Sequence, residues 1–406
     1  MIWTFARHVP DPEEKGYRVP ALSASLSASQ PTHANREKQS TGMRLVILPG
    51  DGIGPEISAA TVRVLEFVSK QFSLGLILET HEIGLTLLKR QGTTVSAATL
   101  QECRRADGIV LGPVSHSQYP PRSEGGINVS GEIRIKLDLY ANVRPSRSRE
   151  GLRHWGRTPM DLVIVRENTE GFYSDRNMFQ GIGEFMPTAD VAISVRKITA
   201  QGSRRIAKAA FDLAKTRRRK VTAVHKANVI KMSEALFLGE VRKVAAAHLD
   251  IAYDEQLVDS MAALLVRDAA QFDVIVTTNM FGDILSDEAS ELSGSLGLGG
   301  SINAGESHCM AQAQHGSAPD IAGQDKANPV SLMLSAALLL EWLAHRHEKP
   351  EFVKAARRIE LAIDTALKDP ARRTADLGGV LGTQSFAETV CGEIGRNQVH
   401  EHSRKI

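Results

Sequence analysis

The stretch Thr277–Glu288 reads TTNMFGDILSDE and directly follows the apolar run Phe272–Val276. The apolar run predicts a buried strand, and the segment after the polar turn predicts a helix. Asp283 and Asp287 are four residues apart, so both carboxylates project from one face of that helix. Two carboxylates this close repel each other unless a cation lies between them, which suggests half of a site for Mg²⁺ or Mn²⁺. Spacing alone leaves open a second interpretation, a solvated acidic first turn of a helix.

The same succession of strand and helix recurs along the chain. Apolar runs predict strands at 45–48, 108–111, 162–165, 221–224 and 274–277, and helical patterns lie at 56–71, 201–215, 232–248 and 331–345. This alternation predicts an α/β protein with a largely parallel sheet. The turn Gly50–Glu56 follows the first run, but its G-x-G-x-G spacing lacks the two-residue gap of a dinucleotide-binding Rossmann turn. A tight turn into a helix explains these glycines, so we do not expect a Rossmann fold.

Composition limits the possible partners. The chain has 406 residues, enough for two domains or one large α/β unit, and is 42% hydrophobic and 24% charged. A net charge of +2 gives no reason to expect nucleic acid as a partner, and no apolar run is long enough to cross a membrane. The cysteines are scattered at positions 103, 309 and 391, which fits a reducing compartment, and we expect a cytoplasmic protein.

Residues 1–42 differ from the rest of the chain. They mix Pro, Ser, Gln and charged residues without apolar periodicity. They lack the continuous apolar core of a secretory signal, and Asp11, Glu13 and Glu14 argue against a mitochondrial presequence. We expect either a disordered extension or a start codon assigned too early, with the folded chain beginning at Met43.

Several charged or polar residues stand where strand ends and loops are expected. Three converging arginines would suit a substrate with two or more carboxylates, although an arginine taken alone is more often a surface residue. Arg166 is the exception, because it ends a buried-looking strand where a bare charge would be costly. A lysine at a buried strand end is a candidate base, whereas a lone tyrosine near a loop is usually a packing residue. The candidates are Arg134, Arg144, Arg166, Tyr173, Lys226 and Asp259, of which the last could supply a third carboxylate to a metal. The polar loop His315–Gly323, followed by Asn328, fits either a nucleotide-binding loop or a surface connection.

Taken together, these segments resemble the β-decarboxylating dehydrogenases, a family of isopropylmalate, isocitrate, homoisocitrate and tartrate dehydrogenases. The resemblance runs from about Met43 to Ile394, and its most specific parts are Gly50–Glu56, Asn142–Pro145, Asn279–Glu288 and His315–Gly323. It implies an open α/β architecture of two domains with the active site in the cleft between them. The first, cofactor-binding domain would comprise residues 43–139 and 294–396, and the second, residues 140–293, would carry dimerisation and the metal and substrate sites.

The resemblance also implies a role for each candidate residue. Arg134, Arg144 and Arg166 match the clamp for the substrate carboxylates, and Tyr173 and Lys226 match the catalytic acid and base. Asp259, Asp283 and Asp287 match the ligands of Mg²⁺ or Mn²⁺. Lys226 and Asp259 would enter the active site from the partner subunit, which implies a homodimer with shared active sites. The residues that match the cofactor loop are His315, Gly316, Ser317, Ala318, Pro319, Asp320, Ile321 and Asn328.

The resemblance leads to an oxidative decarboxylation. Lys226 would take the proton of a C2 hydroxyl while hydride leaves C2, and Tyr173 would protonate C3 after CO₂ is lost. NAD is the expected cofactor, because the Asp320 carboxylate can accept hydrogen bonds from ribose hydroxyls and would repel a 2′-phosphate.

The choice of substrate depends on the segment before Arg134. Isopropylmalate enzymes resemble one another there in a Glu and paired leucines, and isocitrate enzymes in a Ser and an Asn that meet the third carboxylate. Here Gly126–Ile133 reads GINVSGEI and matches neither, with Asn128 and Ser130 as the candidate contacts to the variable group. The first expectation is 3-isopropylmalate, oxidised and decarboxylated to 4-methyl-2-oxopentanoate in leucine biosynthesis. The alternatives are tartrate or malate, isocitrate or homoisocitrate, and a non-catalytic regulatory subunit, which is disfavoured because no clamp or metal residue is missing.

Overall fold

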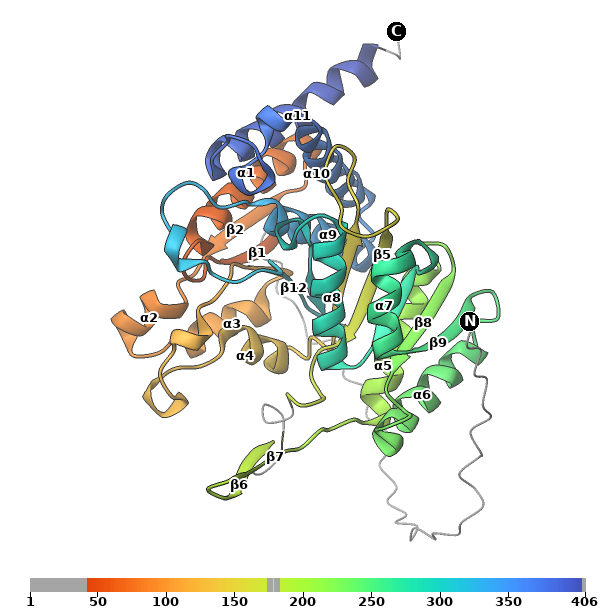
Figure 1. The fold of residues 1–406 in the computed structure, drawn as a ribbon. Coiled ribbons are helices and arrows are strands. Elements are labelled where there is room, and N and C mark those ends of the chain that lie inside the picture. The colour runs from red at the N-terminus through yellow and green to blue at the C-terminus, as the bar shows by residue number, and fades with distance from the viewer. Residues whose placement is uncertain (1–41, 174–177, 179–182, 404–406) are drawn as a thin grey trace, which may run out of the picture. The chain divides into compact units, whose positions relative to one another are not determined.

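The computed structural model describes residues 42–173, 178 and 183–403, and the predicted disordered extension lies outside them except for Gly42. Among the described residues the strands form a ten-stranded sheet and a separate hairpin (Figure 1). The strand order of the large sheet is β2-β1-β3-β12-β11-β4-β5-β10-β8-β9. The strands are β1 (Met43–Leu48), β2 (Leu76–Thr80), β3 (Gly108–Leu111), β4 (Ala141–Arg147), β5 (Asp161–Glu167), β8 (Lys220–His225), β9 (Ala252–Leu257), β10 (Val274–Thr277), β11 (Ile302–Ala304) and β12 (Cys309–Gln312).

Helices cover both faces of this sheet. They are α1 (Gly54–Phe72), α2 (Gly84–Gln91), α3 (Ala97–Arg105), α4 (Val129–Lys136), α5 (Ala200–Ala214), α6 (Lys231–Ala246), α7 (Val258–Asp268), α8 (Asn279–Ser293), α9 (Val330–His347), α10 (Pro350–Lys368) and α11 (Thr383–Ser403). In β5, Val163 and Val165 pack against α5 and α6, whereas Leu162 and Ile164 pack against α7 and α8. Successive residues of a strand face opposite sides, so a strand covered on both sides is apolar throughout. This explains the continuous apolar runs in the sequence.

The predicted open α/β fold is confirmed, and the predicted strands and helices lie at the expected places. The centre of the sheet departs from the parallel pattern, because β11 pairs antiparallel with both β12 and β4, and β4 pairs antiparallel with β5. Buried Asn142 of β4 fixes this junction by donating to Ser301 Oγ at 2.9 Å and to the carbonyl of Ile302 at 3.0 Å. The division into two domains stays a prediction.

The hairpin of β6 (Glu184–Thr188) and β7 (Val191–Ser194) is separate from the large sheet (Figure 1). All its residues are exposed, including the apolar side chains of Phe185, Met186 and Ile193. A two-stranded hairpin alone is at best marginally stable in water, so this one has an apolar surface that remains to be covered. Within the described residues, no helix combines the length and the apolar character that a membrane span requires.

Helix α8 follows β10 directly and contains both Asp283 and Asp287, so the predicted pairing of these carboxylates on one helix is confirmed. The helix approaches β5 closely at Gly282. A Cβ atom at this position would lie 2.6 Å from Cβ and 2.7 Å from Cγ of Arg166. Only glycine therefore permits this spacing between helix and strand.

We expect Gly282→Ala to destabilise the protein by about 1–3 kcal/mol, because the new methyl group would push α8 away from Arg166. Gly392→Ala in α11 is the matched control, since a Cβ there meets nothing within 4 Å. In the control, alanine should raise the free energy of unfolding by up to about 1 kcal/mol through its higher helix propensity. Urea denaturation of both variants measures the difference, and equal effects would contradict the proposed close packing.

Candidate active site

A cavity of about 440 Å³ lies beside the amino-terminal half of α8. Residues from α4, β4, β5 and the segment after β12 complete its wall. Six of the residues predicted from the sequence line it together, namely Asn128, Ser130, Arg134, Arg144, Arg166 and Tyr173, with Asp283 as a seventh. His315 and Gly316 of the predicted cofactor loop line it as well. The cavity therefore gathers candidates that are far apart in the sequence.

Two arginines bind the carboxylates of α8. Arg144 NH1 lies 3.0 Å from Asp287 Oδ1 and 3.4 Å from Asp283 Oδ1, and it donates to Ser286 Oγ at 2.7 Å. Arg166 NH1 forms an ion pair with the same Oδ1 atom of Asp283. Burial alone would raise the pKa of Asp283, but the two guanidinium charges outweigh it and hold the pKa below its usual range. Asp283 is therefore ionised at neutral pH.

Arg166 is nearly inaccessible to solvent at the end of β5. Its Nε and NH2 atoms donate to Asn279 Oδ1 at 3.0 and 2.6 Å, which ties it to the first residue of α8. Burial, reinforced by the charge of Arg144, lowers the pKa of Arg166 to about 10, so the guanidinium stays protonated at neutral pH. Asn279 begins one of the segments that carry the family resemblance, but the sequence analysis gave it no role of its own.

Tyr173 lies on the same side of the cavity as the arginines. Its hydroxyl donates to Asp283 Oδ2 at 3.2 Å, and the Arg166 guanidinium lies 5.8 Å from the centre of its ring. The tyrosine hydroxyl, Arg166 and the α8 carboxylate are thus in mutual contact. A phenol in this position can deliver a proton to a molecule in the cavity.

The segment that precedes Arg134 forms α4 and faces Gln312. Gln312 Oε1 accepts hydrogen bonds from Ser130 Oγ at 3.0 Å and from Arg134 NH2 at 2.9 Å. Asn128 caps the helix, because its Oδ1 accepts from the Gly131 amide at 2.9 Å. The side-chain oxygen of Asn128 therefore stabilises the start of α4, in addition to the residue's place in the cavity wall.

Lys226 and Asp259 lie together but apart from this cavity, among whose lining residues neither is found. Lys226 Nζ lies 2.7 Å from Asp259 Oδ1, and their side chains are 25% and 62% exposed. The hydrogen bond from Lys226 holds the pKa of Asp259 below its usual range. The sequence predicted that these two residues act in the partner's active site, and their separation from the cavity of their own chain is compatible with that prediction.

The residues of α8 fit a divalent cation in part. Asp283 and Asp287 present hard oxygen donors, and Arg144 NH1 already places a positive charge between them. Gln314 Nε2 also donates to Asp287 Oδ1, at 2.9 Å. Among the described residues, however, no group of three His, Cys, Asp or Glu side chains is arranged to hold a metal. Within the described part of the chain, α8 thus offers two carboxylates without a third acidic, histidine or cysteine side chain placed to join them.

The predicted cofactor loop borders a second cavity, of about 280 Å³, which shares His315 and Gly316 with the first. Ala318, Ile321 and Asn328 line it, and so does Asp376, which the sequence analysis did not identify. Asn328 Nδ2 donates to Asp376 Oδ2 at 2.9 Å. Ligands in the two cavities would thus meet at His315 and Gly316. Burial lowers the pKa of His315, so its imidazole is neutral at physiological pH.

The other loop residues surround this cavity. Ser317 Oγ lies 2.7 Å from Ser115 Oγ, and the Ser317 carbonyl accepts from the Ile53 amide at 2.8 Å. Pro319, Asp320 and Ile321 form a short 3₁₀ turn, on which Asp320 is exposed. Gly52 has φ +57°, and a Cβ there would lie 2.0 Å from the Ser317 carbonyl oxygen. The glycine-rich turn therefore packs against the loop, which explains the glycine more closely than the tight turn predicted from the sequence.

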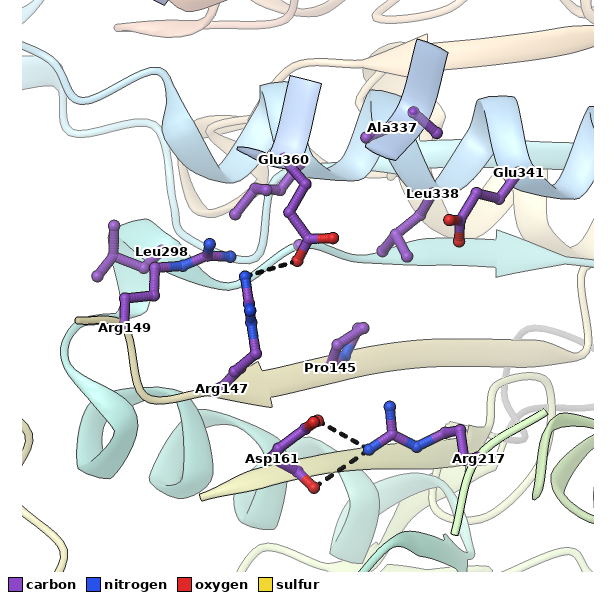
Figure 2. Close-up of a pocket in the computed structure, with 13 residues that line it drawn as sticks. Pro145, Arg147, Arg149, Asp161, Arg217, Leu298, Ala337, Leu338, Glu341 and Glu360 are labelled. Atoms are coloured by element: carbon purple, nitrogen blue, oxygen red, sulfur yellow. Dashed lines mark hydrogen bonds and ion pairs between the residues drawn. The ribbon is translucent and has the colours of Figure 1, made fainter. Parts of the chain in front are cut away.

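A third cavity, of about 300 Å³, faces the opposite side of β4 (Figure 2). Pro145 and Arg147 line it, whereas the alternate strand positions, Arg144 and Ser146, face α8. Its guanidinium groups already have carboxylate partners: Arg147 pairs with Glu360 and Asp364, and Arg217 with Asp161 and Asp273. Since the charges here are balanced, we assign the ligands to the first two cavities.

Comparisons with known proteins agree with this geometry. The family model described as isocitrate/isopropylmalate dehydrogenase matches residues 44–390. The chain is 38% identical to a 3-isopropylmalate dehydrogenase of Saccharolobus solfataricus, over 83% of this chain and 95% of that protein. It is 40% identical to an isocitrate/homoisocitrate dehydrogenase of Thermus thermophilus, over 86% and 97%. A crystal structure of isocitrate dehydrogenase from Methylococcus capsulatus matches with a TM-score of 0.76 and 37% identity, over 87% of this chain and 99% of that chain. Similar identities to enzymes of different substrates do not single out one acid.

We expect Gly52→Ala to weaken dinucleotide binding about tenfold or more, because a displaced Ser317 carbonyl would shift the loop that borders the second cavity. Gly92→Ala is the matched control: Gly92 also has a positive φ, +71°, but a Cβ there meets nothing within 4 Å. Calorimetric titration with NAD measures the dissociation constants. Unchanged affinity in the Gly52 variant would contradict the coupling of turn and loop.

Proposed function

Since this chain belongs to the isocitrate/isopropylmalate dehydrogenase family, we propose that it oxidises and decarboxylates a 2-hydroxy acid with a carboxylate on C3, using NAD. One observation carries the proposal: the three arginines and Tyr173 line one cavity, and its wall at His315 and Gly316 is shared with the cavity of the predicted cofactor loop. A substrate held by the arginines therefore lies next to a dinucleotide held by the loop. The family consists of β-decarboxylating dehydrogenases that use NAD or NADP, and the arrangement of side chains suits their reaction.

Each group of side chains has a separate role in substrate binding or proton transfer. Arg134, Arg144 and Arg166 bind the substrate carboxylates and orient C2 and C3 in the cavity. Lys226 of the partner subunit accepts the proton of the C2 hydroxyl. After CO₂ leaves, Tyr173 donates its hydroxyl proton to C3. When bound, NAD accepts a hydride and a divalent cation near Asp283 and Asp287 withdraws electron density from the substrate oxygens.

A homodimer with shared active sites accounts for the placement of Lys226 and Asp259. Apolar side chains beside both half-sites are exposed in the single chain: Val229 is 66% and Met232 is 90% exposed near Lys226, and Ile284 next to Asp283 is 60% exposed. The apolar hairpin of β6 and β7 adds to this surface. Large apolar side chains that surround catalytic groups are what an interface between subunits would cover.

The end of the cavity near α4 favours a polar substituent on C3 over an isopropyl group. Asn128, Ser130 and His116 line it together with the apolar Val114. Ser130 and the Asn128 side-chain oxygen keep their partners Gln312 and Gly131, but an isopropyl group would displace water from this polar wall and offer no hydrogen bond in return, which costs free energy. We therefore propose a substrate of the tartrate, isocitrate or homoisocitrate type ahead of 3-isopropylmalate, the first expectation from the sequence.

The cofactor proposal rests on the charge of the loop. Asp320 is exposed directly before Ile321, which lines the second cavity. A carboxylate here repels a 2′-phosphate and favours NAD over NADP. Lys326 also lines this cavity, so the preference depends on how far the two charges lie from the bound ribose.

We expect NADH formation with an acid that carries a polar C3 substituent, in the presence of Mn²⁺. The panel comprises isocitrate, homoisocitrate, tartrate, malate and 3-isopropylmalate, each assayed with NAD and with NADP. Ser130→Leu should lower kcat/KM for the polar acid about tenfold or more. It should thereby narrow the difference in kcat/KM between the polar acid and 3-isopropylmalate. A wild-type preference for 3-isopropylmalate would refute the polar substituent, and equal efficiency with NADP would refute the cofactor proposal.

We expect Lys226→Met and Tyr173→Phe each to lower kcat by about 10²- to 10⁴-fold, because each removes a proton-transfer group. Dimers that combine one subunit of each variant should regain about half of the wild-type activity, since one of their two sites then holds both native residues. Differently tagged subunits allow these hybrids to be purified and assayed. If hybrids were as inactive as the two parents, Lys226 would act within its own subunit or not at all.

A further inference from the structure

Arg196 lies between β7 and α5, outside the cavities described above, and its side chain is only 9% exposed. A buried guanidinium needs hydrogen-bond acceptors around it. Arg196 finds them on two segments that carry different functional residues. One is the start of α6, after Lys226, and the other is the start of α8, before Asp283.

On the first side, Arg196 holds the segment of Lys226. Its NH1 donates to Ser233 Oγ at 2.9 Å, and its NH2 forms an ion pair with Glu234. Glu234 is fully buried, and its second oxygen, Oε2, accepts a hydrogen bond from the Lys226 amide at 2.9 Å. The backbone position of Lys226 therefore depends on a carboxylate that Arg196 neutralises.

On the second side, Arg196 meets the amino terminus of α8. NH2 donates to Thr278 Oγ1 at 2.9 Å, and the guanidinium lies 5.5 Å from the centre of the Phe281 ring. Thr278 is the residue directly before α8, the helix that carries Asp283. The neighbouring residue Lys197 exchanges backbone hydrogen bonds with Gly171, at 2.8 and 3.0 Å, two residues before Tyr173.

We propose that Arg196 is a positioning residue that connects two active sites of the dimer. It orients Lys226, which serves the partner's site, and the start of α8, which serves its own. This inference rests on the proposed sharing of active sites. The fork of one guanidinium is suited to the task, because its separate N–H groups can bind both segments at once, whereas a lysine ammonium is a point charge.

Hybrid dimers separate the two effects of Arg196→Met. Adding Tyr173→Phe to one subunit leaves a single working site, in the other subunit. In the first hybrid the working subunit carries Arg196→Met, which tests the start of α8. In the second hybrid Arg196→Met lies on the Tyr173→Phe subunit, which tests the donated Lys226. Wild type paired with Tyr173→Phe is the reference.

We expect kcat to fall at least about tenfold below the reference in both hybrids, because small misplacements of catalytic groups are costly. KM for the substrate should change little in the second hybrid, since its clamp residues are all native. Each hybrid contains one α8 that lacks its contact with Arg196, so Mn²⁺ affinity, measured by paramagnetic resonance without substrate, should fall at one of the two sites in both hybrids. Arg196→Lys should restore part of kcat in the second hybrid and less in the first.

Arg204→Met is the matched control, because Arg204 pairs with buried Glu240 of α6 at 2.7 Å and belongs to the same part of the fold. Hybrids that carry Arg204→Met on either subunit should have the same kcat as the reference hybrid. Reference-level kcat in either Arg196 hybrid, or an equal loss with Arg204→Met, would overturn the proposal. The proposed function has its own test, since hybrids of Lys226→Met and Tyr173→Phe that stay inactive would refute shared active sites whatever Arg196 does.

Discussion

Arg144 and Arg166 bring two positive charges into the interior between β4, β5 and α8, and buried charges require partners. Arg166 forms an ion pair with Asp283 and donates a hydrogen bond to Asn279. Arg144 forms ion pairs with Asp283 and Asp287. These contacts determine how α8 lies on the sheet, and Gly282 allows the helix to come close enough for them. The groups that would bind the substrate and the cation are therefore the same groups that hold the helix in place. Folding and chemistry depend on one set of ion pairs.

In the proposed homodimer, one chain would supply two unequal half-sites. One half consists of the arginines, Tyr173 and the α8 carboxylates around a cavity. The other consists of Lys226 and Asp259, paired with each other at some remove from that cavity. In a single chain the lysine and the aspartate neutralise each other. A second copy would give each of them a new neighbour, so assembly and activation of the base become one event.

The sequence predicted those parts of the structure that local pattern controls. The apolar run that forms β10 and the four-residue spacing in α8 are local, and both were predicted correctly. The antiparallel centre of the sheet was not, because β11 has only three residues and depends on buried Asn142 in a distant strand. Arg196, Glu234 and Asp376 were missed for the same reason: their importance comes from partners brought together by the fold. The cluster around Asp283 was found through the family resemblance, and the structure adds which atoms meet.

Gln312 limits which single substitutions the cavity wall near α4 can accept. Its single carbonyl oxygen accepts from Ser130, Arg134 and the side chain of Asn303. A new residue at position 130 alters the hydrogen bonding of an atom that also orients a guanidinium of the clamp. Mutations at 130 and 312 are therefore epistatic, and drift toward a different acid has to pass through a poorly clamped intermediate or change both positions together. Under the proposed function, the choice of acid would depend on this shared acceptor as much as on the shape of the pocket.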